Sequence, residues 1–171
     1  MKAQGANKGD RVIIYMPMIP EAVVAMLACA RIGAIHSVVF GGFASNELAS
    51  RIDDSKAKIL VTASCGFEPG RTVEYKPLVD EAIKIASHKI EKMILFQRPR
   101  NEVKLNAPNE VSWEEVVSNA KDADCVEMES NEFAYILYTS GTTGTPKGIV
   151  RDIGGHIVAL KWTMKNIYNI D

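Results

Sequence analysis

The stretch KGDRVIIYMPMIPEAVVAMLACARIGAIHSVVFGGF, residues 8–43, decides the fold. Arg11–Met16 is a short run of apolar and β-branched residues, which predicts a buried strand, and Ser37–Phe40 predicts a second one. Between them a proline precedes and a glycine follows Glu21–Ile32, so that segment begins and ends as a helix does. Because this helix is apolar almost all round, we expect it to expose little surface.

Outward from this stretch, the same alternation continues. Three further apolar runs predict strands: Ile59–Thr62, Met93–Phe96 and Phe133–Thr139. We expect Ser45 to cap a helix that continues through Leu48 and Ile52, and an amphipathic helix over Leu78–Ala86. Strand–helix–strand units at this spacing pair in parallel through right-handed crossovers. The predicted fold class is therefore α/β, a mostly parallel sheet flanked by helices.

The pattern weakens between Gln97 and Asn131, which is polar and reads as a surface excursion. Within it, Ser112 followed three residues later by Glu115 predicts the capped start of a short helix. After the strand that ends at Thr139, the sequence predicts a polar loop, a short apolar stretch and a last helix from about Gly155 to Tyr168.

Composition limits the classes of function. The chain has 171 residues, with 20 Lys and Arg against 21 Asp and Glu, so one domain is expected and there is no basic excess for a nucleic-acid partner. Cys29, Cys65 and Cys125 are far apart, which argues against a structural metal site, and Cys29 reads as an inert core thiol. No leader or membrane span is apparent, so we expect an intracellular protein without a membrane partner.

The segment Tyr138–Gly148, YTSGTTGTPKG, begins at the end of the last predicted strand and contains the residues best suited to bind a ligand. Its glycines let backbone N–H groups face an anion, its hydroxyls add donors, and Lys147 adds a mobile positive charge. It is not a Walker A loop, because Pro146 and Gly148 occupy the positions of the second glycine and the Ser/Thr. The residues predict a polyphosphate-binding loop, with a polar loop that binds nothing as the alternative.

This segment resembles the phosphate-binding signature of the adenylate-forming superfamily, which includes acyl-CoA synthetases, luciferases and peptide-synthetase adenylation domains. Residues 8–43 are similar to the N-terminal core of short-chain acyl-CoA synthetases. VRDIGGHIVALKWTMKNIY, residues 150–168, resembles propionyl-CoA synthetase more than acetyl-CoA synthetase. The resemblance covers roughly Lys8–Asp171, nearly the whole chain.

The resemblance implies a reaction in which ATP activates propionate or acetate to an acyl-adenylate, and the acyl group then passes to CoA. It implies that the ATP phosphates are bound by Thr139, Ser140, Gly141, Thr142, Thr143, Gly144 and Lys147. Lys147 is the catalytic residue among them. The ligands of the accompanying Mg²⁺ are expected outside this chain, which provides no metal ligand. The small-molecule partners are then the acid, ATP and CoA, in the cytoplasm or the mitochondrial matrix.

Two further segments match the family where it approaches CoA: Phe40-Gly41-Gly42 and Glu68-Pro69-Gly70-Arg71. Glu68 stands where the acetyl-CoA synthetase pattern has an arginine, and this weakens a phosphate contact at that position. Arg71 keeps its charge and is expected to bind the 3′-phosphate or a diphosphate oxygen. The alternatives are a tight turn with no ligand for the first segment and a solvated arginine for the second.

The resemblance also implies that residues 1–171 are an incomplete AMP-binding domain, without the C-terminal domain. The chain alone is then expected to be inactive, and its exposed truncated core to favour self-association. The alternative is a truncated non-catalytic module with a vestigial phosphate loop. His36 and His156 are expected to be structural, and Asp53-Asp54 to form a solvated helix face.

Overall fold

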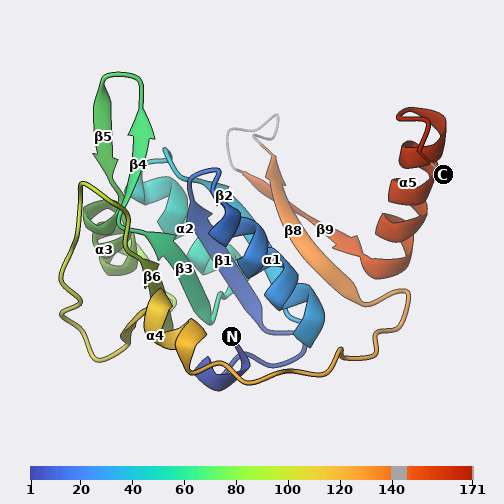
Figure 1. Cartoon of the computed structure of the whole chain (residues 1–171), viewed down its shortest axis with the longest axis horizontal. Coiled ribbons are helices and arrows are strands. Elements are labelled where there is room, and N and C mark those ends of the chain that lie inside the picture. The colour runs from blue at the N-terminus through green and yellow to red at the C-terminus, as the bar shows by residue number, and fades with distance from the viewer. Residues whose placement is uncertain (140–145, 171) are drawn as a thin grey trace.

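A computed structural model of the chain describes residues 1–139 and 146–170 (Figure 1). A 3₁₀ turn at Lys2–Gln4 comes first. It is followed by β1 (Arg11–Met16), α1 (Pro20–Ile32), β2 (Ile35–Phe40), α2 (Ser45–Ser55), β3 (Ile59–Ala63), β4 (Cys65–Glu68), β5 (Arg71–Glu74), α3 (Tyr75–Ile85), β6 (Lys92–Phe96), β7 (Glu110–Ser112), α4 (Trp113–Ser118), β8 (Phe133–Thr139), β9 (Lys147–Asp152) and α5 (Ile153–Asn166).

Seven of these strands form one sheet in the order β7-β6-β3-β1-β2-β8-β9. The pairs are parallel except β8–β9, so the predicted mostly parallel α/β sheet is confirmed. β1 and β8 have the predicted bounds, and β2, β3 and β6 differ from prediction by one or two residues at an end. The β-branched runs form buried central strands because both of their faces are covered by helices.

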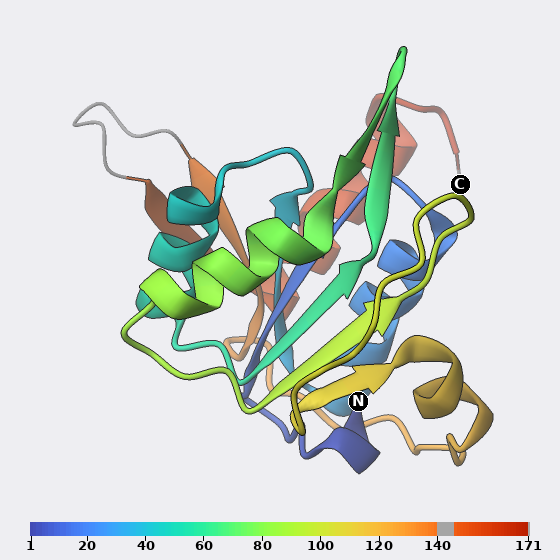
Figure 2. The same ribbon diagram turned by 90° about the vertical axis from the view of Figure 1, so that its left-hand side faces the viewer.

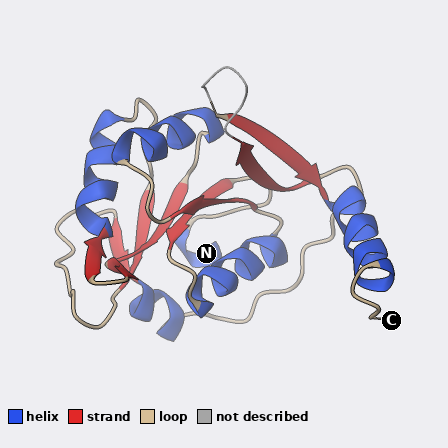
Figure 3. Cartoon of the chain, turned by 90° about the horizontal axis from the view of Figure 1, so that it is seen from above, coloured by secondary structure: helices blue, strands red, loops and turns tan. Residues whose placement is uncertain are grey.

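Helices cover the sheet on two sides. Figure 3 shows α1 and α4 on one face and α2 and α3 on the other. The central strands β1 and β3 are almost wholly buried, with Ile14 and Leu60 fully enclosed. Leu48 and Ile52 of α2 are also fully buried, as their spacing predicts. Cys29 lies in this core, and burial raises the pKa of its thiol to about 12, which keeps it protonated and inert.

The expectation that α1 exposes little surface is wrong. Its small residues, Ala22, Ala25 and Cys29, face the sheet, whereas Val24 is 50% and Leu27 64% exposed. A helix in an outer layer touches the sheet along one side only. Val23, Val24 and Leu27 face away from the sheet, and no described element fully covers them.

The expected cap of α2 is also wrong. Ala44 occupies the N-cap position, and Ser45 is already the first helical residue, so its hydroxyl makes no capping bond. The capping expectation is confirmed at α4, where Ser112 Oγ accepts a hydrogen bond from the backbone N–H of Glu115.

Four strands are absent from the sequence-based prediction: β4, β5, β7 and β9. β4 and β5 form an antiparallel hairpin whose turn includes Gly70 at φ +78°, a conformation that favours glycine. β7 arises within the predicted surface excursion and pairs in parallel with β6. β9 contains the predicted apolar stretch and pairs antiparallel with β8. Each is short or mostly exposed, so hydrophobic periodicity gives little signal.

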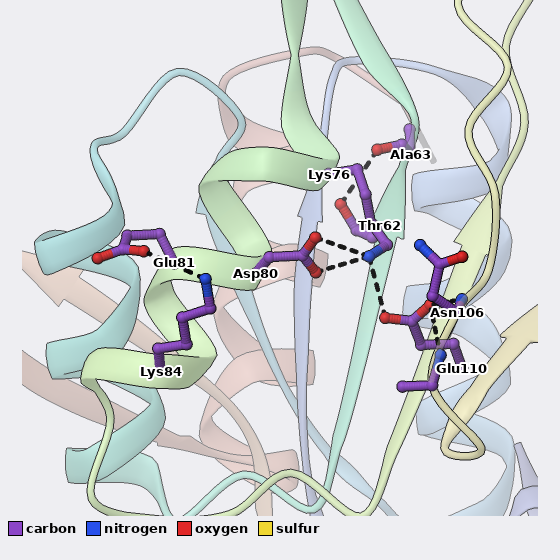
Figure 4. Close-up of polar contacts among 9 residues, drawn as sticks. Thr62, Ala63, Lys76, Asp80, Glu81, Lys84, Asn106 and Glu110 are labelled. Carbon is purple, nitrogen blue, oxygen red and sulfur yellow. Dashed lines mark hydrogen bonds and ion pairs between the residues drawn. The ribbon is translucent and has the colours of Figure 1, made fainter.

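A buried charge cluster holds the excursion against the sheet (Figure 4). Lys76 Nζ lies 2.6 Å from Asp80 Oδ1 and 3.0 Å from Glu110 Oε1. Glu110 also accepts the backbone N–H of Asn106 at 2.8 Å. Burial alone would lower the pKa of Lys76, but the hydrogen bonds to the two carboxylates outweigh it, and the pKa is raised. The cluster joins α3 to β7.

Candidate functional site at the carboxyl edge of the sheet

The segments that carry the predicted chemistry leave the sheet at one edge. β2, β3, β6 and β8 run parallel, so the chain leaves all four at their carboxyl ends. Figure 1 shows this edge at the top, with the β4–β5 hairpin rising from it and the end of β8 and the start of β9 reaching it. Open α/β sheets bind ligands outside the carboxyl ends of their strands.

The β8–β9 hairpin is the base of the predicted phosphate loop. Thr139 and Lys147 are register partners at its end, and both side chains are exposed. The preceding pair is Tyr138 and Gly148. A Cβ at Gly148 would lie 3.1 Å from the Tyr138 ring and 3.3 Å from Asp54 Oδ2, so this close approach suits glycine. The hairpin therefore presents one hydroxyl and one ammonium side by side.

The other predicted phosphate-binding residues lie outside the described residues: Ser140, Gly141, Thr142, Thr143 and Gly144.

A cluster of side chains connects this hairpin to α2. The Tyr138 hydroxyl donates a 2.6 Å hydrogen bond to Asp54 Oδ2, so Asp54 is not simply part of a solvated face. The Arg51 Cζ lies 5.3 Å from the centroid of the Tyr138 ring and 4.9 Å from that of Phe43. Burial raises the pKa of Tyr138, and the Asp54 carboxylate raises it further, so the phenol remains a donor.

The turn after β2 is shaped by two tyrosines. The Tyr15 hydroxyl donates to the Phe43 carbonyl at 2.7 Å. A Cβ at Gly41 would lie 2.5 Å from Tyr75 Oη, so the turn approaches that ring more closely than another residue could. Phe40 is 65% exposed at the end of β2. Phe40-Gly41-Gly42 thus combines a tightly packed turn with an aromatic ring open to solvent.

The β4–β5 hairpin neutralises the arginine that the resemblance assigned to a phosphate. Arg71 Nη2 lies 2.6 Å from Glu68 Oε2, and Arg71 Nε donates to the same oxygen at 2.7 Å. Glu68 is the residue that departs from the acetyl-CoA synthetase pattern. Pro69 and Gly70 form the turn between them. An anion can bind Arg71 only in competition with this carboxylate.

Two nearby arginines were missed by the sequence analysis. The Cζ atoms of Arg98 and Arg100 lie 4.2 and 5.5 Å from the centroid of the Phe67 ring. Neither forms an ion pair with any residue that the structure describes. The available signal was Arg98-Pro99-Arg100 directly after the predicted strand Met93–Phe96, at the carboxyl edge.

His36 and His156 meet at a second place, across Tyr135. The rings of His36 and Tyr135 stack at 5.5 Å, and the Tyr135 hydroxyl lies 3.3 Å from His156 Nδ1. They border an apolar groove of about 370 Å³ between α1 and α5. Burial, and to a lesser degree His156, lowers the pKa of His36 to about 4, so His36 is neutral near pH 7.

In residues 1–139 and 146–170, no group of three or more His, Cys, Asp or Glu side chains is arranged to hold a metal ion. Over the same residues, no helix has the length and apolar character needed to cross a membrane.

Comparisons with known proteins identify the family of the chain. A family model described as AMP-binding enzyme matches residues 1–170. The chain belongs to this family. Among curated relatives, acyl-CoA synthetase short-chain family member 3, mitochondrial, of Rattus norvegicus is 57% identical over 168 residues, 98% of this chain and 25% of that protein. Acetyl-coenzyme A synthetase of Yersinia pestis is 46% identical over 172 residues, 99% of this chain and 26% of that protein.

A solved structure extends the likeness to the fold of this AMP-binding chain. Acetoacetyl-CoA synthetase from Streptomyces lividans matches with a TM-score of 0.88 at 25% identity, covering 99% of this chain and 26% of that one. The α/β fold and the resemblance to short-chain acyl-CoA synthetases are thereby confirmed. The chain spans about a quarter of the length of the relatives that it matches.

Proposed function

We propose that this chain is the N-terminal part of an AMP-binding domain within a longer short-chain acyl-CoA ligase. Residues 1–171 would be an incomplete domain, and the C-terminal domain would lie elsewhere in that protein. The ligase joins propionate or acetate to the α-phosphate of ATP and releases pyrophosphate. It then transfers the acyl group from the adenylate to the thiol of CoA and releases AMP. The names of the relatives support a short-chain acid.

The observation that carries the proposal is the hairpin that presents Thr139 beside Lys147 at the carboxyl edge. A carboxylate is a weak nucleophile, so catalysis requires that it be held in line with the α-phosphate and that charge on the leaving pyrophosphate be stabilised. Lys147 is the catalytic cation for the second task. Backbone N–H groups and hydroxyls from Thr139 to Gly144 would bind the same phosphates.

The resemblance implies that Mg²⁺ accompanies ATP and that its ligands lie outside this chain. Mg²⁺, when bound to the nucleotide, would neutralise phosphate charge. The adenine, the acid and the metal would be held by parts of the longer protein.

CoA would approach the same edge from the side of β2. Phe40-Gly41-Gly42 offers an exposed ring on a closely packed turn. Glu68-Pro69-Gly70-Arg71 offers only a neutralised pair. We therefore add Arg98 and Arg100 to the proposed CoA site, because their guanidinium groups have no carboxylate partner among the described residues and can bind phosphate bidentately.

The cellular setting follows from the proposed substrates. We propose the cytoplasm or the mitochondrial matrix as the compartment, and the acid, ATP and CoA as the partners, with neither nucleic acid nor membrane. The rat relative is named as mitochondrial.

Replacing Lys147 tests the proposal in the longer protein. In Lys147→Ala, adenylate formation should fall about a hundredfold, because negative charge grows on pyrophosphate as its bond breaks. Thioester formation from preformed acyl-adenylate should change much less, since pyrophosphate has already left. Both half-reactions are measured with propionate and with acetate, and the exposed Lys84→Ala on α3 serves as the control.

Equal losses in both half-reactions would mean that Lys147 maintains the fold, and the assignment would be withdrawn. A longer protein with no pyrophosphate release on either acid would favour the non-catalytic module. The 171-residue chain alone should form no acyl-CoA, because contacts to the terminal phosphates cannot orient the α-phosphate.

A further inference from the structure

We propose that Arg51 is the positioning residue that fixes the phosphate hairpin against the turn after β2. The inference rests on the proposed function and extends it, because Arg51 belongs to neither predicted binding segment. It would act through Tyr138, which precedes the loop by one residue, and through Phe43, which follows the glycine turn.

The backbone alone holds the hairpin weakly at this end. Over the described residues, the β2–β8 ladder has one register pair, His36 with Tyr135, near the start of β8. Toward Thr139, β8 continues with β9 as its ladder partner, and β9 is the edge strand of the sheet. Side chains must therefore hold the end that carries Thr139 and Lys147.

Arg51 of α2 lies between Phe43, which follows β2, and Tyr138 of β8. Its side chain is only 7% exposed, and its Nη1 lies 2.8 Å from Glu47 Oε2 and 2.6 Å from the Glu47 carbonyl. These bonds fix the planar group beside the rings of Phe43 and Tyr138. A buried guanidinium beside two aromatic faces is favourable because each ring presents negative charge density to the cation.

Asp54, one helical turn along α2, adds a second contact to the hairpin. It accepts the Tyr138 hydroxyl at 2.6 Å and lies close to Gly148 on the opposite strand. Figure 2 shows the teal helix α2 beside the orange strands of the hairpin. A single rigid helix thus contacts both strands next to Thr139 and Lys147.

The position of the hairpin should affect the rate of adenylate formation. The phosphate-binding groups must meet the nucleotide in a fixed position, because a displacement of about 1 Å can cost up to about a hundredfold in rate. Removing the guanidinium leaves Tyr138 with its contacts to Asp54 and Ser55 at the end of α2 but without a contact that also reaches Phe43. We expect Thr139 and Lys147 to be positioned less well, which slows adenylate formation without changing which groups touch ATP.

The test compares Arg51→Met with Arg11→Met in the longer protein. Arg11 is the matched control, because its Nε donates to the Ser55 carbonyl at 2.7 Å, at the C-terminal end of the same helix. Both variants lose an arginine that supports α2, but only Arg51 contacts Tyr138 and Phe43. Measurements are the unfolding midpoint, kcat and KM for each half-reaction, and the NMR shifts of Thr139 and Lys147 in the 171-residue chain.

We expect Arg51→Met to slow adenylate formation about tenfold, with the KM for the acid unchanged, and to shift the Thr139 and Lys147 amides. Arg11→Met should lower the unfolding midpoint as much as Arg51→Met does. It should leave the rate of adenylate formation and the Thr139 and Lys147 amide shifts near their wild-type values. Arg51→Lys, which keeps the charge without the planar group, should recover part of the rate.

Three results would overturn the inference. These are unchanged adenylate formation in Arg51→Met, losses in both half-reactions that match those of Arg11→Met, and unmoved Thr139 and Lys147 shifts. If the wild-type protein has no ligase activity, the proposed function fails. The NMR comparison then still decides whether Arg51 positions the hairpin.

Discussion

The chain contains two regions that are built differently. In the body, made of β1, β2, β3, β6 and the helices α1 to α3, the central strands are almost wholly buried. In the arm, made of β8, β9 and α5, most residues are exposed or half-buried, and no described residue of α5 is buried. Leu60 of the body is fully enclosed, whereas Leu137 of the arm is 49% exposed.

Most of the stability is expected to come from the body, whereas the proposed phosphate chemistry belongs to the arm. The body contains its own core, whereas the arm carries the phosphate hairpin and depends on a few side chains to fix its place. Elements with few buried contacts open at a lower free-energy cost than core strands do. The proposed phosphate binding would benefit from such an attachment, and Arg51, Asp54 and Tyr138 join the base of the hairpin to α2.

The largest contrast should come from truncating one leucine in each region. Leu60→Ala should lower the free energy of unfolding by about 4 kcal/mol, because the fully buried site leaves a cavity. Leu137→Ala should cost less than about 1 kcal/mol, since half of its side chain already meets solvent. Urea unfolding of the 171-residue chain measures both. Similar losses would mean that the arm has a core of its own.

Ion pairs should show the same contrast. In the body, Lys76→Met leaves Glu110, whose side chain is 8% exposed, without its cation, and should cost about 3 kcal/mol. The corresponding pair at the foot of the arm is Lys8 with Glu132, and it is well exposed. Lys8→Met should change stability much less, because solvent screens the pair. Thermal unfolding at low and high salt compares them, and an equal effect would contradict the assignment of the body.

Acid should weaken the contact between body and arm. Burial lowers the pKa of His36 from 6.5 to about 4, so the unfolded chain binds more protons than the folded chain between these values. Stability is therefore present above pH 6.5 and is lost as the pH falls toward 4, by about 2 kcal/mol between about pH 7 and about pH 5. His36→Gln should reduce this loss. An unchanged pH profile in His36→Gln would refute the prediction.

The smallest effect concerns the helix ends. Asp152 accepts the backbone N–H of Gly155 at the start of α5, whereas Ser45 makes no cap bond at the start of α2. Asp152→Ala should cost about 1 kcal/mol and appear mainly as faster amide exchange in α5. Ser45→Ala should change little. Slower or unchanged exchange in α5 would show that its N-terminus is held by other contacts.

The strands that the sequence predicts best are those that form continuous apolar runs, including β8, whose residues are exposed or half-buried. β1, β3 and β6 are buried on both faces and appear in the sequence as continuous apolar runs, so their bounds are nearly correct. The β4–β5 hairpin and β7 lack such runs, and their pairing depends on partners that lie far away in the sequence. The exposure of α1 was mispredicted because composition does not reveal which side of a helix faces a sheet.

The candidate site divides in the same way. The motif Tyr138–Gly148 is local, and its glycines, hydroxyls and Lys147 predict phosphate binding from residue types alone. The approach of Arg51 to both Phe43 and Tyr138, and the neutralisation of Arg71 by Glu68, are properties of side-chain packing. Local sequence patterns are sufficient to assign the α/β class and to predict a phosphate-binding loop. The pairing of charges and the side chains that contact the β8–β9 hairpin depend on tertiary packing, because these contacts join residues far apart in the chain.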